Sequence, residues 1–334
     1  MKKSPARGIA ALVVTAALAL AGCSSGGTTT QPSGGGDGGG AAKEYRVGVT
    51  QILAHQSLDA AREGFKEALA DAGLKVTYDE NNAQGEQATA TAIAQKFNTG
   101  NVDLVLAIAT PTAQASAQVI TNKPILFTAV TDPVAAKLVA STDKPGANVT
   151  GTTDMNPVAD QIALVKKLKP EAKTVGVIYS SGEVNSEVQV ELAKEAAKAE
   201  GLELVEKTIT NTGEVAQAAA SLDVDAIYVP TDNNVVTGLA AVVQVTEQKK
   251  IPLVVGEGDS VRAGGIITTG IDYRQLGYQT GEMAVRILKD GADPATMPVE
   301  AQKEYTTFVN KKAAERMGVT IPEDLLTGAT DVSS

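Results

Sequence analysis

Small polar residues stand directly after two apolar runs that have the character of buried parallel strands. Val102–Ala109 is almost continuously apolar and ends at Thr110, and Ile125–Val130 ends in the same way at Thr131 and Asp132. Ligands of open α/β sheets bind beyond the carboxyl ends of the strands, so both turns are expected on one rim. A helix that begins at about Pro111–Thr112 would aim free N–H groups at that rim. Together with the Thr110 and Thr131 hydroxyls, this predicts a site for a carboxylate, although threonine before proline also occurs as turn chemistry alone.

Carboxylates in other turns predict a partner for a positive group. Thr231 and Asp232 follow an apolar strand at residues 226–229, where Asp232 would either pair with a ligand ammonium or cap the next helix. The same two interpretations, ligand contact or turn chemistry, apply to Asp132, Asn185 and Asp272. Hydroxyl and N–H groups that face carboxylates across a cleft would fit a zwitterion.

Further rim candidates follow the first two expected strands. Gln51 ends the strand at residues 45–51, and His55 follows in the next turn, either at the rim or as a loop histidine that packs its ring. Asn82 and Gln84 lie in a polar turn after the strand near residues 75–78.

Enzyme chemistry has little support in the residues. The chain holds one histidine and one cysteine, and it contains neither a Gly-Lys-Ser/Thr phosphate loop nor a Gly-x-Ser-x-Gly elbow. We therefore expect no catalytic residues, no cofactor and no metal site. Tryptophan is absent and aromatic residues make up 3%, which weakens a sugar-binding interpretation. The aromatic side chains that could still line a cleft are Phe127, Tyr179, Tyr228 and Tyr273.

The strand-and-turn pattern occurs twice, which indicates two copies of one βαβ unit. Val102-Asp103 is matched by Val224-Asp225, Pro124 by Pro252, and Val47-Gly48-Val49 by Val175-Gly176-Val177, at offsets of 122 to 128 residues. Strands alternate with helices throughout, which is typical of an α/β fold with parallel sheets. Among the expected helices are a short one at Ala135–Ser141 and a continuous one at Asn234–Lys249.

The domain boundaries follow from this repeat. We expect residues 44–153 plus about 271–291 to form lobe 1, and residues 154–270 plus about 297–334 to form lobe 2, joined by a hinge. The length of 334 residues suffices for two such domains.

The N-terminus predicts export and a lipid anchor. A basic start and the apolar run Ile9–Leu20 have the form of a signal peptide at residues 1–22. Leu-Ala-Gly-Cys23 resembles the lipobox of bacterial lipoproteins, which implies a diacylglycerol on Cys23. A Gly/Ser-rich flexible tether would then span residues 23–43. Loss of the signal changes the formal net charge from −10 to −13, which argues against nucleic acid as a partner.

Several longer stretches are similar to one family. Residues 107–111 (AIATP), 129–136 (AVTDPVAA), 148–151 (NVTG), 228–233 (YVPTDN) and 270–277 (GIDYRQLG) resemble ABC transporter substrate-binding lipoproteins of the tryptophan/tyrosine type, over about residues 45–312. The resemblance implies a type I periplasmic-binding fold on the extracytoplasmic face of the cell membrane. It also implies a receptor that delivers an amino acid to a permease with a cytoplasmic ATPase. Thr110 and Thr131 would then hold the carboxylate, and Asp232 the amino group.

Other functions remain open from the sequence. A sensor, or a receptor for a nucleoside, a purine or a sugar, would use the same two lobes. An extracellular α/β enzyme is the alternative from another class.

Overall fold

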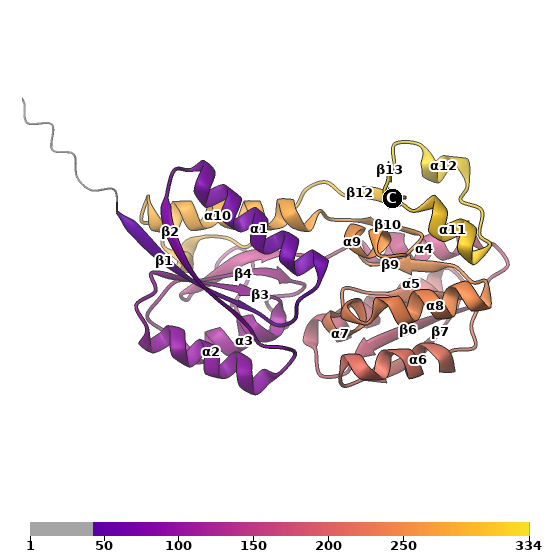
Figure 1. Ribbon diagram of the computed structural model, residues 1–334, viewed down its shortest axis with the longest axis horizontal. Coiled ribbons are helices and arrows are strands. Elements are labelled where there is room, and N and C mark those ends of the chain that lie inside the picture. The colour runs from indigo at the N-terminus through magenta and orange to yellow at the C-terminus, as the bar shows by residue number, and fades with distance from the viewer. Residues whose placement is uncertain (1–42, 334) are drawn as a thin grey trace, which may run out of the picture. The chain divides into compact units, whose positions relative to one another are not determined.

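The structure is a computed structural model and describes residues 43–333 (Figure 1). The expected signal peptide, Cys23 and all but the last residue of the expected tether lie outside the described residues. Within them, no helix combines the length and the apolar character needed to cross a bilayer.

The first lobe is built on a six-stranded sheet with the order β11-β5-β4-β3-β1-β2, in which all pairs are parallel. The apolar runs around residues 104–108 and 125–130 form its fully buried central strands, because helices cover both faces. The elements of this lobe are β1 (Glu44–Gln51), α1 (Gln56–Asp71), β2 (Lys75–Asn82), α2 (Gln87–Thr99), β3 (Leu104–Ile108), α3 (Thr110–Val119), β4 (Ile125–Val130), β5 (Val149–Thr153), α10 (Tyr273–Leu288), η2 (Pro294–Thr296) and β11 (Glu300–Ala301).

The second lobe is built on a seven-stranded sheet with the order β13-β12-β10-β9-β8-β6-β7. Its pairs are parallel except that β12 runs antiparallel to β10. The elements are α4 (Val158–Leu168), β6 (Thr174–Ser180), α5 (Val184–Ala199), β7 (Glu203–Ile209), η1 (Thr212–Glu214), α6 (Val215–Ser221), β8 (Ala226–Val229), α7 (Asn233–Thr237), α8 (Leu239–Lys249), β9 (Leu253–Val255), α9 (Gly258–Arg262), β10 (Ile267–Gly270), β12 (Thr306–Val309), α11 (Lys311–Met317), α12 (Glu323–Leu326) and β13 (Thr330–Asp331).

The internal repeat appears as one topology used twice. The order β5-β4-β3-β1-β2 corresponds to β10-β9-β8-β6-β7, strand for strand. Gly48 of β1 and Gly176 of β6 occupy equivalent positions. A Cβ on Gly48 would lie 2.9 Å from the Phe97 ring, and one on Gly176 would lie 2.8 Å from the Leu222 side chain. Both glycines therefore leave room for the helix that covers the strand. The two lobes confirm the expected α/β architecture of a type I periplasmic-binding protein.

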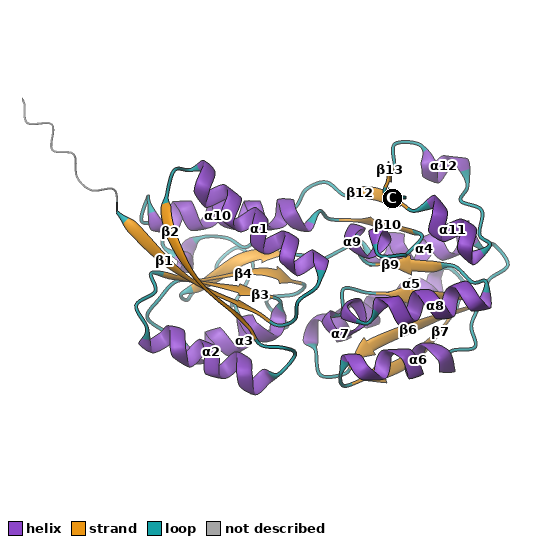
Figure 2. Ribbon diagram, viewed as in Figure 1, coloured by secondary structure: helices purple, strands orange, loops and turns teal. Residues whose placement is uncertain are grey.

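Helices cover both faces of each sheet (Figure 2). In the first lobe α1 packs closely along α10, and α2 packs beside α3; in the second, α4 packs beside α5, and α6 beside α8. The contact between α1 and α10 depends on small residues. A Cβ on Gly277 would lie 1.8 Å from the Ala61 carbonyl oxygen, and one on Gly64 would lie 1.9 Å from that of Arg274.

The chain crosses between the lobes at residues 154–157, 271–272 and 302–305. Hydrogen bonds tie these crossings to one another: Ile271 N donates to Asn156 Oδ1 over 3.2 Å, and Asp272 N donates to Gln302 Oε1 over 3.1 Å. The three crossing segments between the lobes are thus connected laterally by hydrogen bonds.

Some local expectations differ from the structure. Residues 133–137 form turns rather than a helix, because Lys137 adopts a left-handed φ of 59° that interrupts helical geometry. The helix expected at 234–249 is divided at Gly238 into α7 and α8. Strand β11 pairs with β5 of the first sheet, whereas the sequence analysis placed all residues after 297 in lobe 2.

Candidate functional site

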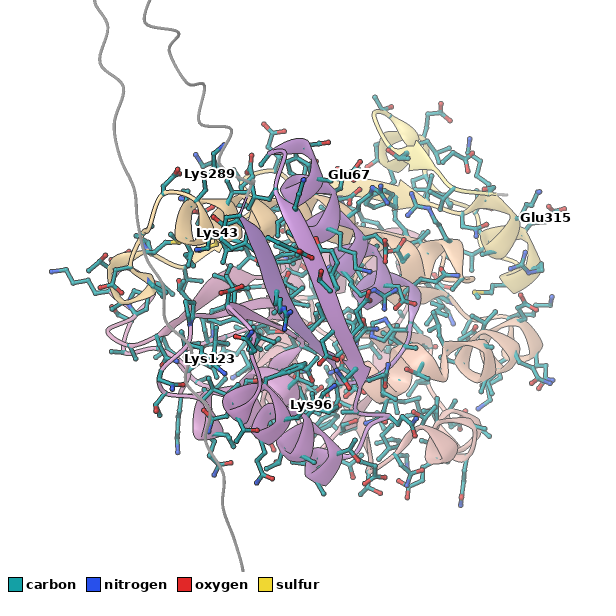
Figure 3. The ribbon with its side chains drawn as sticks, turned by 60° about the vertical axis from the view of Figure 1, so that its left-hand side comes forward. Lys43, Glu67, Lys96, Lys123, Lys289 and Glu315 are labelled. Atoms are coloured by element: carbon teal, nitrogen blue, oxygen red, sulfur yellow. The ribbon has the colours of Figure 1, made fainter. Side chains whose placement is uncertain are left out.

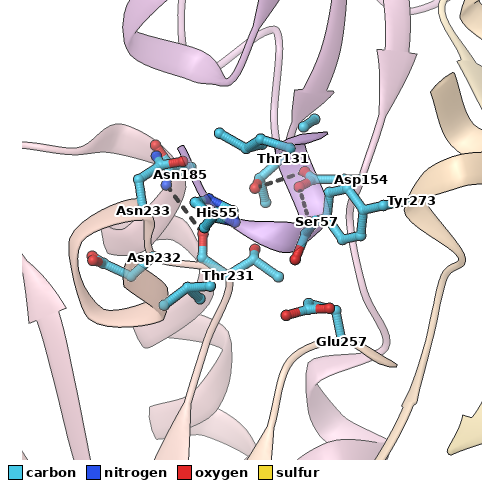
Figure 4. A pocket seen from close by; sticks show the side chains of 13 residues that line it. His55, Ser57, Thr131, Asp154, Asn185, Thr231, Asp232, Asn233, Glu257 and Tyr273 are labelled. Carbon is cyan, nitrogen blue, oxygen red and sulfur yellow. Dashed lines mark hydrogen bonds between the residues drawn. The ribbon is translucent and has the colours of Figure 1, made fainter. Parts of the chain in front are cut away.

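A cleft between the two lobes gathers polar side chains from the carboxyl ends of both sheets (Figure 4). The first lobe contributes the start of α1 and the turns after β4 and β5, and the second contributes the starts of α5 and α7 and the turn after β9. The space not filled by atoms there, open solvent included, amounts to about 300 Å³. The lining residues are His55, Ser57, Leu58, Ala129, Thr131, Asp154 and Tyr273 on the first-lobe side, and Asn185, Thr231, Asp232, Asn233, Val236 and Glu257 on the other.

The structure brings five of the predicted ligand-binding residues to this cleft and places six others elsewhere. The residues at the cleft are His55, Thr131, Asn185, Thr231 and Asp232, and those that do not line it are Gln51, Asn82, Gln84, Thr110, Asp132 and Asp272.

Four of these six predicted residues form local structure instead. The Gln51 amide donates to Leu53 O over 2.7 Å and to the Asp59 carboxylate over 2.9 Å. Asn82 Oδ1 accepts from the backbone N–H of Gln84 within their own turn. The carboxylate of Asp132 accepts two backbone N–H groups of its turn, both at 2.9 Å.

Asp272 likewise forms local structure, because it caps α10. From the sequence, Asp132 and Asp272 could each have served either as a ligand contact or in turn chemistry. Their hydrogen bonds correspond to the turn-chemistry interpretation.

Thr110 occupies the first turn of α3, beside the cleft-lining residues of β4. Its hydroxyl is buried and has no hydrogen-bond partner among the described residues, and no side chain caps this helix. The preceding Ala109 has a φ of 79°, and Ala129, which does line the cleft, has a φ of 57°. Two non-glycine residues with positive φ at adjacent strand ends mark locally strained backbone, a feature that clusters at ligand sites.

Asp154 is the center of a hydrogen-bonded cluster on one side of the cleft. The Thr131 hydroxyl donates to Asp154 Oδ1 over 3.0 Å, and the Tyr273 hydroxyl donates to Oδ2 over 2.6 Å. Because a carboxylate accepts about four hydrogen bonds, acceptor capacity remains on Asp154. The Thr131 O–H is directed at a negative group, so this side of the cleft presents acceptors. It suits an ammonium better than the carboxylate that the sequence assigned to Thr131.

Asp232 has a different environment. Its carboxylate accepts hydrogen bonds from Ser180 N at 2.6 Å, Ser180 Oγ at 3.1 Å, Ser186 Oγ at 2.6 Å and Val235 N at 2.9 Å. These four donors use its acceptor capacity, and the bond to Val235 caps α7. The position predicted to hold a ligand ammonium thus joins the start of α7 to the end of β6 and the first turn of α5.

Two further buried glutamates surround the cleft. Glu257 lines it at the start of α9, where it accepts from Asp259 N over 2.6 Å and from Ser260 N over 2.9 Å. Burial, and secondarily the Asp259 charge, raises the pKa of Glu257 to about 7. Glu183 lies behind the lining and accepts from the amides of Asn185 at 3.0 Å and Asn233 at 2.6 Å. Burial, followed by the neighbouring Asp232, raises its pKa to about 7 as well.

The lining of the cleft is therefore acidic, and among residues 43–333 no lysine or arginine belongs to it. Charged residues such as Glu67, Lys289 and Glu315 project from the outer surface (Figure 3). Burial also raises the pKa of Asp154. The one basic group, His55, is neutral at pH 7 because burial lowers its pKa to about 4. Buried carboxylates without a cation are costly, so a ligand ammonium would relieve a real energetic penalty.

Several polar atoms at the cleft have no hydrogen-bond partner among the described residues. They are Ser57 Oγ, both ring nitrogens of His55 and Asn185 Oδ1. Ser57 lies near Glu257, and His55 near Asn233, but neither pair meets hydrogen-bond geometry. Because buried polar groups are nearly always paired, these atoms point to a polar ligand. Ser57 also lies in the first turn of α1, whose N-terminus lacks a side-chain cap and favours a negative group.

Sequence reasoning missed Asp154, Ser57, Asn233 and Glu257, and it gave Tyr273 only as one of four candidate aromatics. Of the other three, Phe127 and Tyr228 are buried in the cores and Tyr179 hydrogen-bonds to Glu206. Asp154 follows β5, and Glu257 follows β9 by two residues, so the strand-end rule that found Thr131 would have found both. Within residues 43–333, no group of three or more His, Cys, Asp or Glu is placed to hold a metal ion.

Comparison with known proteins identifies the family. The family model described as "ABC transporter substrate binding protein" matches residues 46–333. The chain belongs to this family. It is therefore a solute-binding protein of an ABC importer and a binding protein rather than an enzyme, as the sequence predicted. A "Tyrosine-binding protein" of Clostridioides difficile (strain R20291) is 42% identical over 275 residues, which are 80% of this chain and 79% of that protein.

Two solved structures bear on the state of the lobes. A Streptococcus pneumonia ABC domain in complex with L-Trp is 38% identical, has a TM-score of 0.83, and is matched over 86% of this chain and 99% of that one. A ligand-free, open substrate-binding protein with adhesive properties from Clostridium difficile is 41% identical, with a TM-score of 0.66 over 87% and 99%. At similar identity, the lobes of this chain are arranged more as in the L-Trp complex. The closed arrangement is also seen in Gln189 Nε2, which reaches Thr131 Oγ1 across the cleft at 3.5 Å.

Proposed function

We propose that this substrate-binding protein captures an aromatic L-amino acid, tyrosine or tryptophan, between its two lobes and delivers it to the permease of an ABC importer. The observation that carries the proposal is the closed, acidic cleft, in which Asp154 retains acceptor capacity and no cationic side chain is present. Such a cleft favours a ligand that brings its own ammonium group. The relatives named for tyrosine and L-Trp support an aromatic side chain.

The two ends of a zwitterion have distinct partners in this proposal. The ammonium would contact Asp154, with Glu257 nearby. The carboxylate would lie at the unpaired hydroxyl of Ser57, where the uncapped start of α1 adds N–H groups and a positive dipole end. Closure of the lobes would desolvate both charges together, which makes their recognition cooperative.

Isothermal titration calorimetry of the purified full-length protein tests this proposal. We expect saturable binding of L-tyrosine or L-tryptophan at a single site, and much weaker binding of L-glutamate, glucose and adenosine. Saturable binding of glucose or adenosine, together with no binding heat for either aromatic amino acid, would refute the proposed function.

We also propose that a lipid on Cys23 holds the protein at the extracytoplasmic face of the cell membrane. The support is the Leu-Ala-Gly-Cys motif after a basic and apolar leader. Cys23→Ala should move the protein from the membrane fraction to the soluble fraction, with Ser24→Ala as the matched control. Equal membrane retention of the Cys23→Ala variant would contradict the anchor.

A further inference from the structure

An unpaired imidazole lines the cleft beside Asn185 and Asn233. His55 occupies the N-cap position of α1 but makes no capping hydrogen bond. Its Nδ1 and Nε2 atoms are both buried without a partner among the described residues. Figure 4 shows it beside Asn185 and Asn233, with Asp154 and Tyr273 on the other side of the view.

The neighbours of His55 define what kind of ligand group fits there. The amides of Asn185 and Asn233 both donate to Glu183, at 3.0 and 2.6 Å, which turns Asn185 Oδ1 away from Glu183 and leaves it unpaired. Glu183 and Asp232 carry carboxyl groups behind these amides. A ligand carboxylate directly beside Asn185 Oδ1 would face an acceptor and two acidic groups, so it is disfavoured at that position.

A donor group is favoured at the same place. A neutral imidazole offers one N–H donor and one acceptor nitrogen, and Asn185 Oδ1 offers a second acceptor. The phenol O–H of tyrosine or the indole N–H of tryptophan would satisfy such acceptors. Phenylalanine would leave these acceptors buried and unpaired. Such unpaired buried groups weaken binding of the ligand that lacks the donor, and so they discriminate strongly against it.

Resting on the proposed function, we infer that His55 is the specificity-determining residue that selects aromatic amino acids whose ring carries an O–H or N–H group over phenylalanine. Asn185 assists by its free Oδ1 atom, and Glu183 acts as a positioning residue because it orients the Asn185 and Asn233 amides. The ammonium is assigned to Asp154, because that carboxylate lines the cleft directly, whereas Glu183 lies behind it.

The test is a ligand-by-variant titration. Calorimetry on the full-length protein measures L-tyrosine, L-tryptophan, L-phenylalanine and 4-fluoro-L-phenylalanine, which matches tyrosine in size but has no donor. Wild type should bind the better of tyrosine and tryptophan at least about tenfold more tightly than either donor-free ligand. His55→Leu should reduce this preference to about threefold or less, and His55→Gln should retain part of it. Val236→Ala, which changes only apolar lining, should weaken all four ligands alike.

The outcomes separate the inference from the proposed function. A wild type that binds phenylalanine as tightly as tyrosine and tryptophan overturns the inference and leaves the function standing. A His55→Leu variant that loses all four ligands by the same factor also overturns it, because His55 would then hold the shared amino-acid group. If His55→Leu does not fold by circular dichroism, His55→Gln decides: a reduced preference for tyrosine over 4-fluoro-L-phenylalanine supports the inference, and an unchanged preference overturns it. No binding of any of the four ligands overturns both.

Discussion

Replacement of Asp154 by asparagine should separate the loss of ligand binding from the loss of fold. The side chain is 3% exposed and is held at 3.0 Å by the Thr131 hydroxyl and at 2.6 Å by the Tyr273 hydroxyl. Asparagine keeps the shape but removes the charge that would pair with the ligand ammonium. Loss of one partner of a buried charge pair costs about 2–4 kcal/mol, and this corresponds to a Kd raised roughly 30- to 700-fold.

The same substitution should change the stability of the free protein little. Asparagine accepts at one oxygen only, so one of the Thr131 and Tyr273 hydroxyls loses its partner, at a cost of about 1–3 kcal/mol. Removal of a buried carboxylate without a cation offsets part of that cost.

The assay for Asp154→Asn is calorimetric titration with L-tyrosine and L-tryptophan, alongside thermal unfolding of the free protein. Asp143→Asn, at an exposed acidic residue, is the matched control and should bind as wild type does. An Asp154→Asn variant that binds within about threefold of wild type would refute the ammonium assignment.

Three further perturbations follow from the geometry. A ligand ammonium favours the ionised form of Glu257, whose pKa is raised to about 7, so binding should release protons and the Kd should fall as the pH rises through 7; a flat calorimetric pH profile would contradict this. Asp232→Ala removes an α7 cap and leaves buried donors unpaired, so it should lower the unfolding free energy by about 2–4 kcal/mol in urea titrations; unchanged stability with lost binding would restore its role as the ammonium partner. Gly277→Ala places a methyl group 1.8 Å from the Ala61 carbonyl oxygen and should lower the unfolding free energy by several kcal/mol. Gly291→Ser, in open space but at a φ of 73°, should lower it by about 1–2 kcal/mol. Similar losses of unfolding free energy in the two variants would contradict close packing of α1 on α10.

The sequence predicted the fold well because the signals that specify it are local and repeated. Apolar runs such as Ile125–Val130 became fully buried strands, and the matched Gly48 and Gly176 became equivalent positions in two sheets of one topology. The expectations that differ from the structure depend on single backbone conformations or short pairings. The left-handed Lys137 ended a helical pattern, and the two-residue strand β11 returned to the first sheet.

Five of the residues predicted from strand ends and turns line the cleft, and six others lie outside its lining. The expectation that ligands bind beyond strand ends singled out Thr131 and Asp232. Position at a strand end does not determine which partners a side chain hydrogen-bonds to. The acceptor capacity of the Asp232 carboxylate is used by Ser180, Ser186 and Val235. Thr131 donates to Asp154, which lies in a segment that crosses between the lobes and carries no sequence motif. These distinctions depend on tertiary neighbours and become visible only in the folded lobes.

A crystal structure of the full-length chain grown with L-tyrosine or L-tryptophan would show directly which carboxylate holds the ligand ammonium. We expect one ligand in the closed cleft, with its ammonium within hydrogen-bond distance of Asp154 and its carboxylate at the start of α1. Closed lobes around a ligand whose ammonium contacts Asp232 instead, or an aromatic amino acid bound only outside the cleft, would contradict it.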